Sequence, residues 1–137
     1  MSKKIREVMT PAPETIQADR PATEAAQKMR DADAGMIPVM DNGTLLGTVT
    51  DRDITLRVVA EGKDPQSTPV GEIASRELVT VQPEEDLDAA LEKMAKHQVR
   101  RLPVVEDGRL IGVVAQADVA REGSEKDVGH TVEEISK

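Results

Sequence analysis

Small and apolar side chains recur at helical spacing in two places along the chain. The first set falls at i, i+3, i+4 and i+7 and consists of Ala22, Ala25, Ala26 and Met29. The second set repeats that spacing with Leu87, Ala90, Leu91 and Met94. Because side chains at this spacing lie on one face of a helix, each stripe predicts an amphipathic helix packed against a core.

Each helical stripe is followed by two short apolar runs that enclose a turn. The runs cover residues 37–40 and 45–50 in the first half and residues 102–105 and 110–114 in the second. Their turns contain the dipeptides Asn42-Gly43 and Asp107-Gly108. Such dipeptides are favoured where two successive turn residues need positive φ, so each pair of runs predicts a β-hairpin.

The two halves are copies of one module at an offset of 65 residues. The offset superimposes, without a gap, Pro38 and Pro103, Gly43 and Gly108, and Asp53 and Asp118. A β-prone piece opens each copy, at 15–17 and 79–81, and a second short helix is expected to close it. The module is therefore β-α-β-β-α, repeated once, in a mixed α/β (α+β) fold. One copy alone is at the marginal end of domain size, so we expect the copies to share a core.

The repeat also divides the chain. We expect repeat 1 over 5–60, a turn-rich connector over 61–71 and repeat 2 over 72–122. The remaining residues, 123–137, are polar and acidic, and predict a mobile or peripherally attached tail.

The composition of the chain narrows the range of possible functions and partners. The chain has 137 residues, a net charge of −8, a pI of about 4.8, and no Phe, Tyr, Trp or Cys. The acidic balance disfavours nucleic acid and an anionic membrane surface as partners, and no apolar run reaches the roughly 20 residues of a spanning helix. Without cysteine there are no disulfides or thiolate metal sites, and the cytoplasm is the default location. His97 and His130 lack companions at ligand spacing, so we predict no metal site.

Several motifs carry a resemblance to a known family. The stretches VMTP at 8–11, GTVTDRDI at 47–54 and HQVRRLPVV at 97–105 resemble those of tandem CBS-domain pairs, or Bateman modules. Small stand-alone bacterial proteins of the hypoxic response type are most similar, and the resemblance covers roughly residues 5–122. It implies two CBS repeats packed through their sheets with pseudo-twofold symmetry, clefts that bind adenosine-containing ligands, and a homodimer.

The family's T-x-x-D motif is matched by Thr50 and Asp53. In the family the hydroxyl meets phosphate and the carboxylate takes the ribose hydroxyls, while a helix start with free N–H groups suits an anion. The same spacing is also that of a near-capping box, which needs no ligand. Both readings can hold at once. In the second copy Ala115 replaces the threonine while Asp118 persists, so we predict two unequal sites.

The resemblance implies a residue set for each cleft. The better nucleotide cleft is predicted to contain Thr48, Thr50, Asp53, Ala74, Ser75, Val79, Val99, Arg100 and Arg101. The weaker cleft is predicted to contain Thr10, Glu14, Gly35, Met36, Val113 and Asp118. The two arginines offer forked donors that match phosphate oxygens, although a solvated pair on a loop is the alternative.

Sequence reasoning leads to a regulatory module rather than an enzyme. No nucleophile, base and orienting acid occur together, and no glycine-rich phosphate loop is present. We predict binding of an adenosine nucleotide of the AMP, ADP or ATP class, no required cofactor, and signalling to a separate partner protein. The alternative is a ligand-free homodimeric scaffold or stress protein in which T-x-x-D is only a helix cap. A metal-binding stress protein is a third and weaker alternative.

Overall fold

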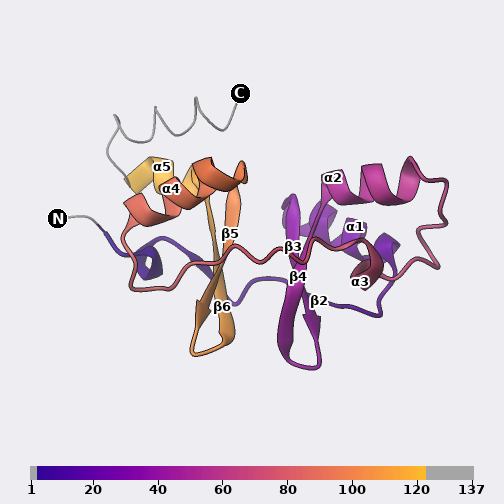
Figure 1. Cartoon of the computed structure of the whole chain (residues 1–137), viewed down its shortest axis with the longest axis horizontal. Coiled ribbons are helices and arrows are strands. Elements are labelled where there is room, and N and C mark those ends of the chain that lie inside the picture. The colour runs from indigo at the N-terminus through magenta and orange to yellow at the C-terminus, as the bar shows by residue number, and fades with distance from the viewer. Residues whose placement is uncertain (1–2, 123–137) are drawn as a thin grey trace. The chain divides into compact units, whose positions relative to one another are not determined.

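A computed structural model describes residues 3–122 of the chain; the predicted acidic tail lies outside the described residues (Figure 1). In chain order the elements are the 3₁₀ helix η1 (Ile5–Glu7), β1 (Thr10–Pro11), β2 (Ile16–Gln17), α1 (Ala22–Ala32), β3 (Met36–Asp41), β4 (Thr44–Thr50), α2 (Asp51–Ile54), the π-helical turn η2 (Thr55–Val59), α3 (Val70–Ile73), α4 (Leu87–His97), β5 (Arg101–Glu106), β6 (Arg109–Ala115) and α5 (Gln116–Glu122). Helices and strands are mixed in both halves, so the predicted α+β class is confirmed.

The chain forms two compact units. We call residues 14–78 the repeat-1 unit, and residues 3–13 together with 79–122 the repeat-2 unit. Each unit contains one three-stranded sheet, in the order β2-β3-β4 in the repeat-1 unit and β1-β6-β5 in the repeat-2 unit. The repeats of the sequence and the units in space therefore do not have the same boundaries.

Both predicted hairpins are present. The strands β3 and β4, and likewise β5 and β6, pair antiparallel around two-residue turns. In each turn both central residues have positive φ, 51° and 82° at Asn42 and Gly43 and 51° and 77° at Asp107 and Gly108. The opening strand is present only in the first copy, because the piece at 79–81 makes a single parallel bridge from Val81 to Val104.

The two amphipathic helices, α1 and α4, also follow the prediction, with one difference. Seven of the eight stripe residues are buried, whereas Ala26 is exposed although its counterpart Leu91 is 3% exposed. Alanine has little apolar surface to hide, so α1 tolerates a narrower buried face than α4. Both helices end on a left-handed residue that is not glycine, Asp33 at φ 51° and Gln98 at φ 54°.

Each unit is completed by a segment that lies outside its own repeat of hairpin and helices. Residues 3–13 and 68–78 are copies of one another at the same offset of 65. The first segment packs on repeat 2, where Ile5 N donates to Glu85 O at 3.0 Å; the second packs on repeat 1, where Val70 N donates to Arg20 O at 2.8 Å. Ile5 and Val70 are both fully buried.

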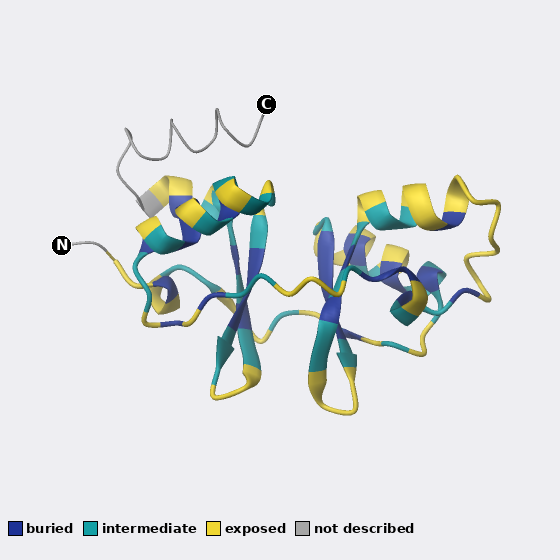
Figure 2. Cartoon of the chain, viewed as in Figure 1, coloured by how far each residue is buried: buried dark blue, intermediate teal, exposed yellow. Residues whose placement is uncertain are grey.

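These two segments change the expected picture of the core. The buried side chains of the repeat-1 unit form one cluster, and those of the repeat-2 unit form another (Figure 2). At the end of the predicted connector Thr68 is 6% exposed, and α3, which begins at Val70, contributes Val70 and Ile73 to the first cluster. Because each copy recruits a segment, it gains the burial that its own residues alone could not supply.

Among residues 3–122, no helix combines the length and the apolar composition that crossing a membrane requires.

Candidate functional site

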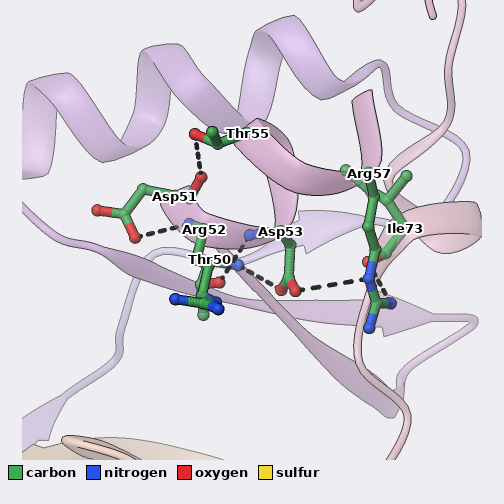
Figure 3. Close-up of polar contacts among 7 residues, drawn as sticks. All are labelled: Thr50, Asp51, Arg52, Asp53, Thr55, Arg57 and Ile73. Carbon is green, nitrogen blue, oxygen red and sulfur yellow. Dashed lines mark hydrogen bonds and ion pairs between the residues drawn. The ribbon is translucent and has the colours of Figure 1, made fainter. Parts of the chain in front are cut away.

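The T-x-x-D motif lies where β4 ends and α2 begins, in the repeat-1 unit (Figure 3). Thr50 has extended backbone at φ −115° and ψ 166°, and its Oγ1 accepts a hydrogen bond from Asp53 N at 3.1 Å. Thr50 N in turn donates to Asp53 Oδ2 at 2.9 Å. The predicted capping box is thus complete, and it satisfies two backbone donors that a helix start would otherwise leave unpaired.

The cap engages only one oxygen of the Asp53 carboxylate. The other oxygen, Oδ1, lies 3.9 Å from Arg57 Nε, which is within ion-pair range but too long for a hydrogen bond. The Asp53 side chain is 14% exposed. Arg57 is held in place by a hydrogen bond from its Nη1 to Ile73 O at 3.1 Å (Figure 3). Asp53 therefore keeps an acceptor oxygen that no described residue hydrogen-bonds.

The segment 73–75 runs beside β4 in the same unit. Thr48 and Ser75 exchange both backbone hydrogen bonds, at 3.0 Å and 2.8 Å. The approach is close at Gly47, where a Cβ atom would lie 2.2 Å from Ser75 O, so only glycine fits there. Five residues of the predicted better cleft lie in this one unit: Thr48, Thr50, Asp53, Ala74 and Ser75. Of these, Ala74 is buried and belongs to the core cluster.

The equivalent corner in the repeat-2 unit lies between β6 and α5 and keeps half of the cap. Ala115 N donates to Asp118 Oδ2 at 3.2 Å, but alanine has no hydroxyl to accept from the helix. Asp118 Oδ1 accepts a hydrogen bond from Arg121 Nη2 at 2.7 Å. Both oxygens of this carboxylate are therefore engaged. Gln116 Nε2 beside it is buried and has no hydrogen-bond partner among residues 3–122.

The remaining predicted site residues are divided between the units. Val79, Val99, Arg100, Arg101, Thr10 and Val113 belong to the repeat-2 unit, and Glu14, Gly35 and Met36 to the repeat-1 unit. Gly35 O accepts from Asp51 N at 3.1 Å and Arg100 O from Gln116 N at 2.7 Å, so these two residues support equivalent corners. Thr10 pairs with Val113 across β1 and β6. The predicted grouping of these residues into two clefts stays a prediction.

Sequence reasoning missed Arg57 and Arg121, the two arginines that contact the acids. Their signal was present, because a base three or four residues after an acid lies on the same helix face. The spacing alone did not show that Arg57 hydrogen-bonds to the carbonyl of Ile73 while Arg121 hydrogen-bonds directly to Asp118. It also did not show that residues 73–75 run beside β4.

The chain matches proteins of known family. The CBS domain model matches residues 5–60 and 70–125. The chain is 41% identical over 133 residues to the CBS domain-containing protein YhcV of Bacillus subtilis, covering 96% of this chain and 94% of that protein. It is 38% identical over 117 residues to Hypoxic response protein 1 of Mycobacterium tuberculosis, covering 85% and 82%.

Solved structures agree with these relatives and show what they hold. A crystal structure of Hypoxic Response Protein I with two coordinated zinc ions has a TM-score of 0.82 at 35% identity, covering 89% of this chain and 100% of that one. The CBS domain pair of protein MJ0100, in complex with 5′-methylthioadenosine and S-adenosyl-L-methionine, has a TM-score of 0.80 at 27% identity, covering 88% and 95%. In this chain, residues 3–122 contain no group of three or more His, Cys, Asp or Glu side chains placed to hold a metal ion.

Proposed function

This chain belongs to the CBS domain family, and on that basis we propose that it binds an adenosine-containing ligand of the AMP, ADP or ATP class at the Thr50–Asp53 corner. Occupancy of this corner is then signalled to a separate partner protein. Catalysis forms no part of the proposal. The proposal includes a homodimer, as the family resemblance implies, and a cytoplasmic location.

The spare carboxylate oxygen of Asp53 is the observation that carries the proposal. A vicinal diol donates two hydrogen bonds, and a carboxylate is an acceptor with room for both. Asp53 Oδ2 is used by the cap, while Oδ1 has no hydrogen bond from a described residue and is 3.9 Å from the nearest arginine nitrogen. The adenosine compounds bound by the MJ0100 CBS pair support the choice of ligand class.

Phosphate recognition at this corner is assigned to Thr50 Oγ1; the two arginines before β5 belong to the repeat-2 unit and are candidates in their own right. Arg100 is exposed and Arg101 is partly exposed, and neither guanidinium forms an ion pair with another residue in 3–122. A guanidinium without a carboxylate partner keeps its full set of donors for phosphate oxygens. We propose both as phosphate ligands.

Calorimetric titration with AMP and with ATP tests the proposal. We expect one dominant site, lost in Asp53→Ala, because the ribose hydroxyls lose their acceptor. The matched variant Asp118→Ala removes the equivalent acid of repeat 2 and should leave the dominant site in place. Two equal sites, or unchanged binding in Asp53→Ala, would contradict the proposal.

The complete capping box favours a second candidate function, a ligand-free scaffold that works through self-association. Here Thr50 and Asp53 serve only to start α2. Thermal denaturation with a panel of adenosine compounds separates the two, because a ligand that binds only the native state raises the melting temperature as its concentration rises. A scaffold shows no shift with any compound while it still forms an oligomer in sedimentation.

A further inference from the structure

Each of the two corner acids is followed by an arginine, but at different spacing. Arg57 stands four residues after Asp53, and Arg121 stands three residues after Asp118. The offset of the repeats would place Arg121 on Leu56 rather than on Arg57. The two arginines are therefore not copies of one ancestral contact, and their effects on the acids can differ.

In repeat 1 the arginine hydrogen-bonds to a main-chain carbonyl and not to the acid. The helix continues from α2 into the π-helical turn Thr55–Val59, and Arg57 donates from that turn to Ile73 O at 3.1 Å. Its Nε stays 3.9 Å from Asp53 Oδ1. The carbonyl of Ile73 thus holds the guanidinium beside the carboxylate without a hydrogen bond between them.

In repeat 2 the arginine is hydrogen-bonded to the acid. Arg121 Nη2 lies 2.7 Å from Asp118 Oδ1, while the other carboxylate oxygen accepts from Ala115 N. A diol that approaches Asp118 must first displace this charge-assisted bond. The Arg121 side chain is 75% exposed, so the barrier is that of an exposed ion pair rather than a buried one.

We propose that the position of the arginine that follows each corner acid is a specificity determinant, which leaves Asp53 open to a vicinal diol and weakens diol binding at Asp118. At i+4, anchored on Ile73 O, the arginine supports the acid electrostatically; at i+3 it competes with the ligand for the same oxygen. The inference rests on the proposed function, and it assigns the inequality of the two corners to Arg121 as well as to the missing hydroxyl at Ala115.

The test moves the competing charge into repeat 1. Leu56 is 47% exposed, so Leu56→Arg is compatible with folding and places a guanidinium three residues after Asp53, as in repeat 2. Leu56→Gln is the matched control with a polar but uncharged side chain. Affinity is measured for AMP and for its 2′,3′-dideoxy analogue, because the ratio of the two cancels any effect of the new charge on phosphate.

We expect Leu56→Arg to reduce the preference for AMP over the dideoxy analogue by about two- to five-fold, the range set by an exposed ion pair. Leu56→Gln should keep the native preference. In repeat 2, Arg121→Gln should strengthen the weaker binding event by a similar factor, for AMP and not for the analogue.

An unchanged AMP preference in Leu56→Arg would overturn the inference while leaving the proposed function intact. A native protein that binds AMP and the dideoxy analogue equally would instead show that Asp53 does not read the ribose. That result contradicts the residue assignment of the proposed function itself, and the inference with it. The two failures are therefore distinguishable in one set of titrations.

Discussion

The repeat-1 and repeat-2 units have the same backbone at their strand-to-helix corners and different polar groups on it. In both, a backbone N–H donates to the acid three residues later, at 2.9 Å from Thr50 and at 3.2 Å from Ala115. Only repeat 1 has the hydroxyl, and only repeat 2 has an arginine hydrogen-bonded to the acid. The main-chain geometry that holds the helix start is the same in both copies, while the side chains around the acid have diverged.

The segments that complete the two units differ in a similar way. Ile5 and Val70 fill equivalent buried positions, but the next residue is Arg6 in one copy and Gly71 in the other. Arg6 forms ion pairs with Glu84, at 2.8 Å, and with Glu106. The backbone N–H donates to repeat 1 or repeat 2 in both segments, from Gly71 N to Ala18 O and from Arg6 N to Pro83 O, each at 2.9 Å. At Gly71 a Cβ atom would lie 3.1 Å from Ala18 O, so the segments share the main-chain bond and differ in the side chain that follows the buried residue.

The largest expected effect comes from emptying the buried position in the segment 3–13. Ile5→Ala should destabilise the repeat-2 unit by about 2–5 kcal/mol, because a fully buried isoleucine leaves a cavity. Urea denaturation followed by circular dichroism measures the loss, since the chain has no aromatic residue to follow. Hydrogen exchange should show that the loss of protection is concentrated in α4, β5 and β6.

Val70→Ala is the matched variant for the other unit. Its loss of protection should be concentrated in α1, β3 and β4, because Val70 belongs to the repeat-1 core cluster. If either variant loosened both units equally, the division of the core into two clusters would be wrong in solution.

A smaller effect is expected from exchanging the caps. Thr50→Ala should cost about 1 kcal/mol, because Asp53 N loses its acceptor at the start of α2. Ala115→Thr should recover a similar amount in repeat 2 by supplying the missing acceptor. The free energy of unfolding of the two single variants and their combination measures both terms. A stabilising Thr50→Ala would indicate that the hydroxyl is kept for a ligand at a cost to the fold.

The smallest effect is a pH dependence that differs between the units. In the repeat-2 unit, a hydrogen bond to Asp86 raises the pKa of Lys4 above its ordinary value of 10.5. Its contribution to stability is therefore complete below pH 10.5 and is lost as the pH rises through the raised pKa. In the repeat-1 unit, the hydrogen bond from Arg20 lowers the pKa of Glu24 below 4.5, so that contribution is complete above pH 4.5 and is lost in acid.

These contributions are measured from the urea midpoint of unfolding across both pH ranges. The midpoints of the Lys4→Met and Glu24→Gln variants are compared with that of the native chain. The difference from native should vanish above the raised pKa for Lys4→Met and below the lowered pKa for Glu24→Gln. The Lys4 side chain is exposed and that of Glu24 is partly exposed, so the changes in the urea midpoint will be small. A difference for Lys4→Met that persisted through strong alkali would assign the effect to packing of the lysine stem.

Local features of the fold were predictable because short-range patterns specify them. The turns at Asn42 and Asp107 follow from residues that tolerate positive φ, and the stripes of α1 and α4 follow from helical spacing. The pairing of Thr50 with Asp53 was also predictable, because three residues separate a cap from its partner. Exposure of Ala26 was not, since a small side chain gives a weak burial signal.

Reading along the chain was enough to establish a duplicated α+β module, its hairpins, its caps and the acid in each copy, because neighbours within a few residues dictate those features. Contacts between distant segments decided the rest: that residues 3–13 complete the second unit, that 68–78 complete the first, and that Ile73 O holds Arg57 away from Asp53. Contacts of this kind depend on which segments lie side by side in the folded chain, and residue spacing along the sequence does not specify that arrangement.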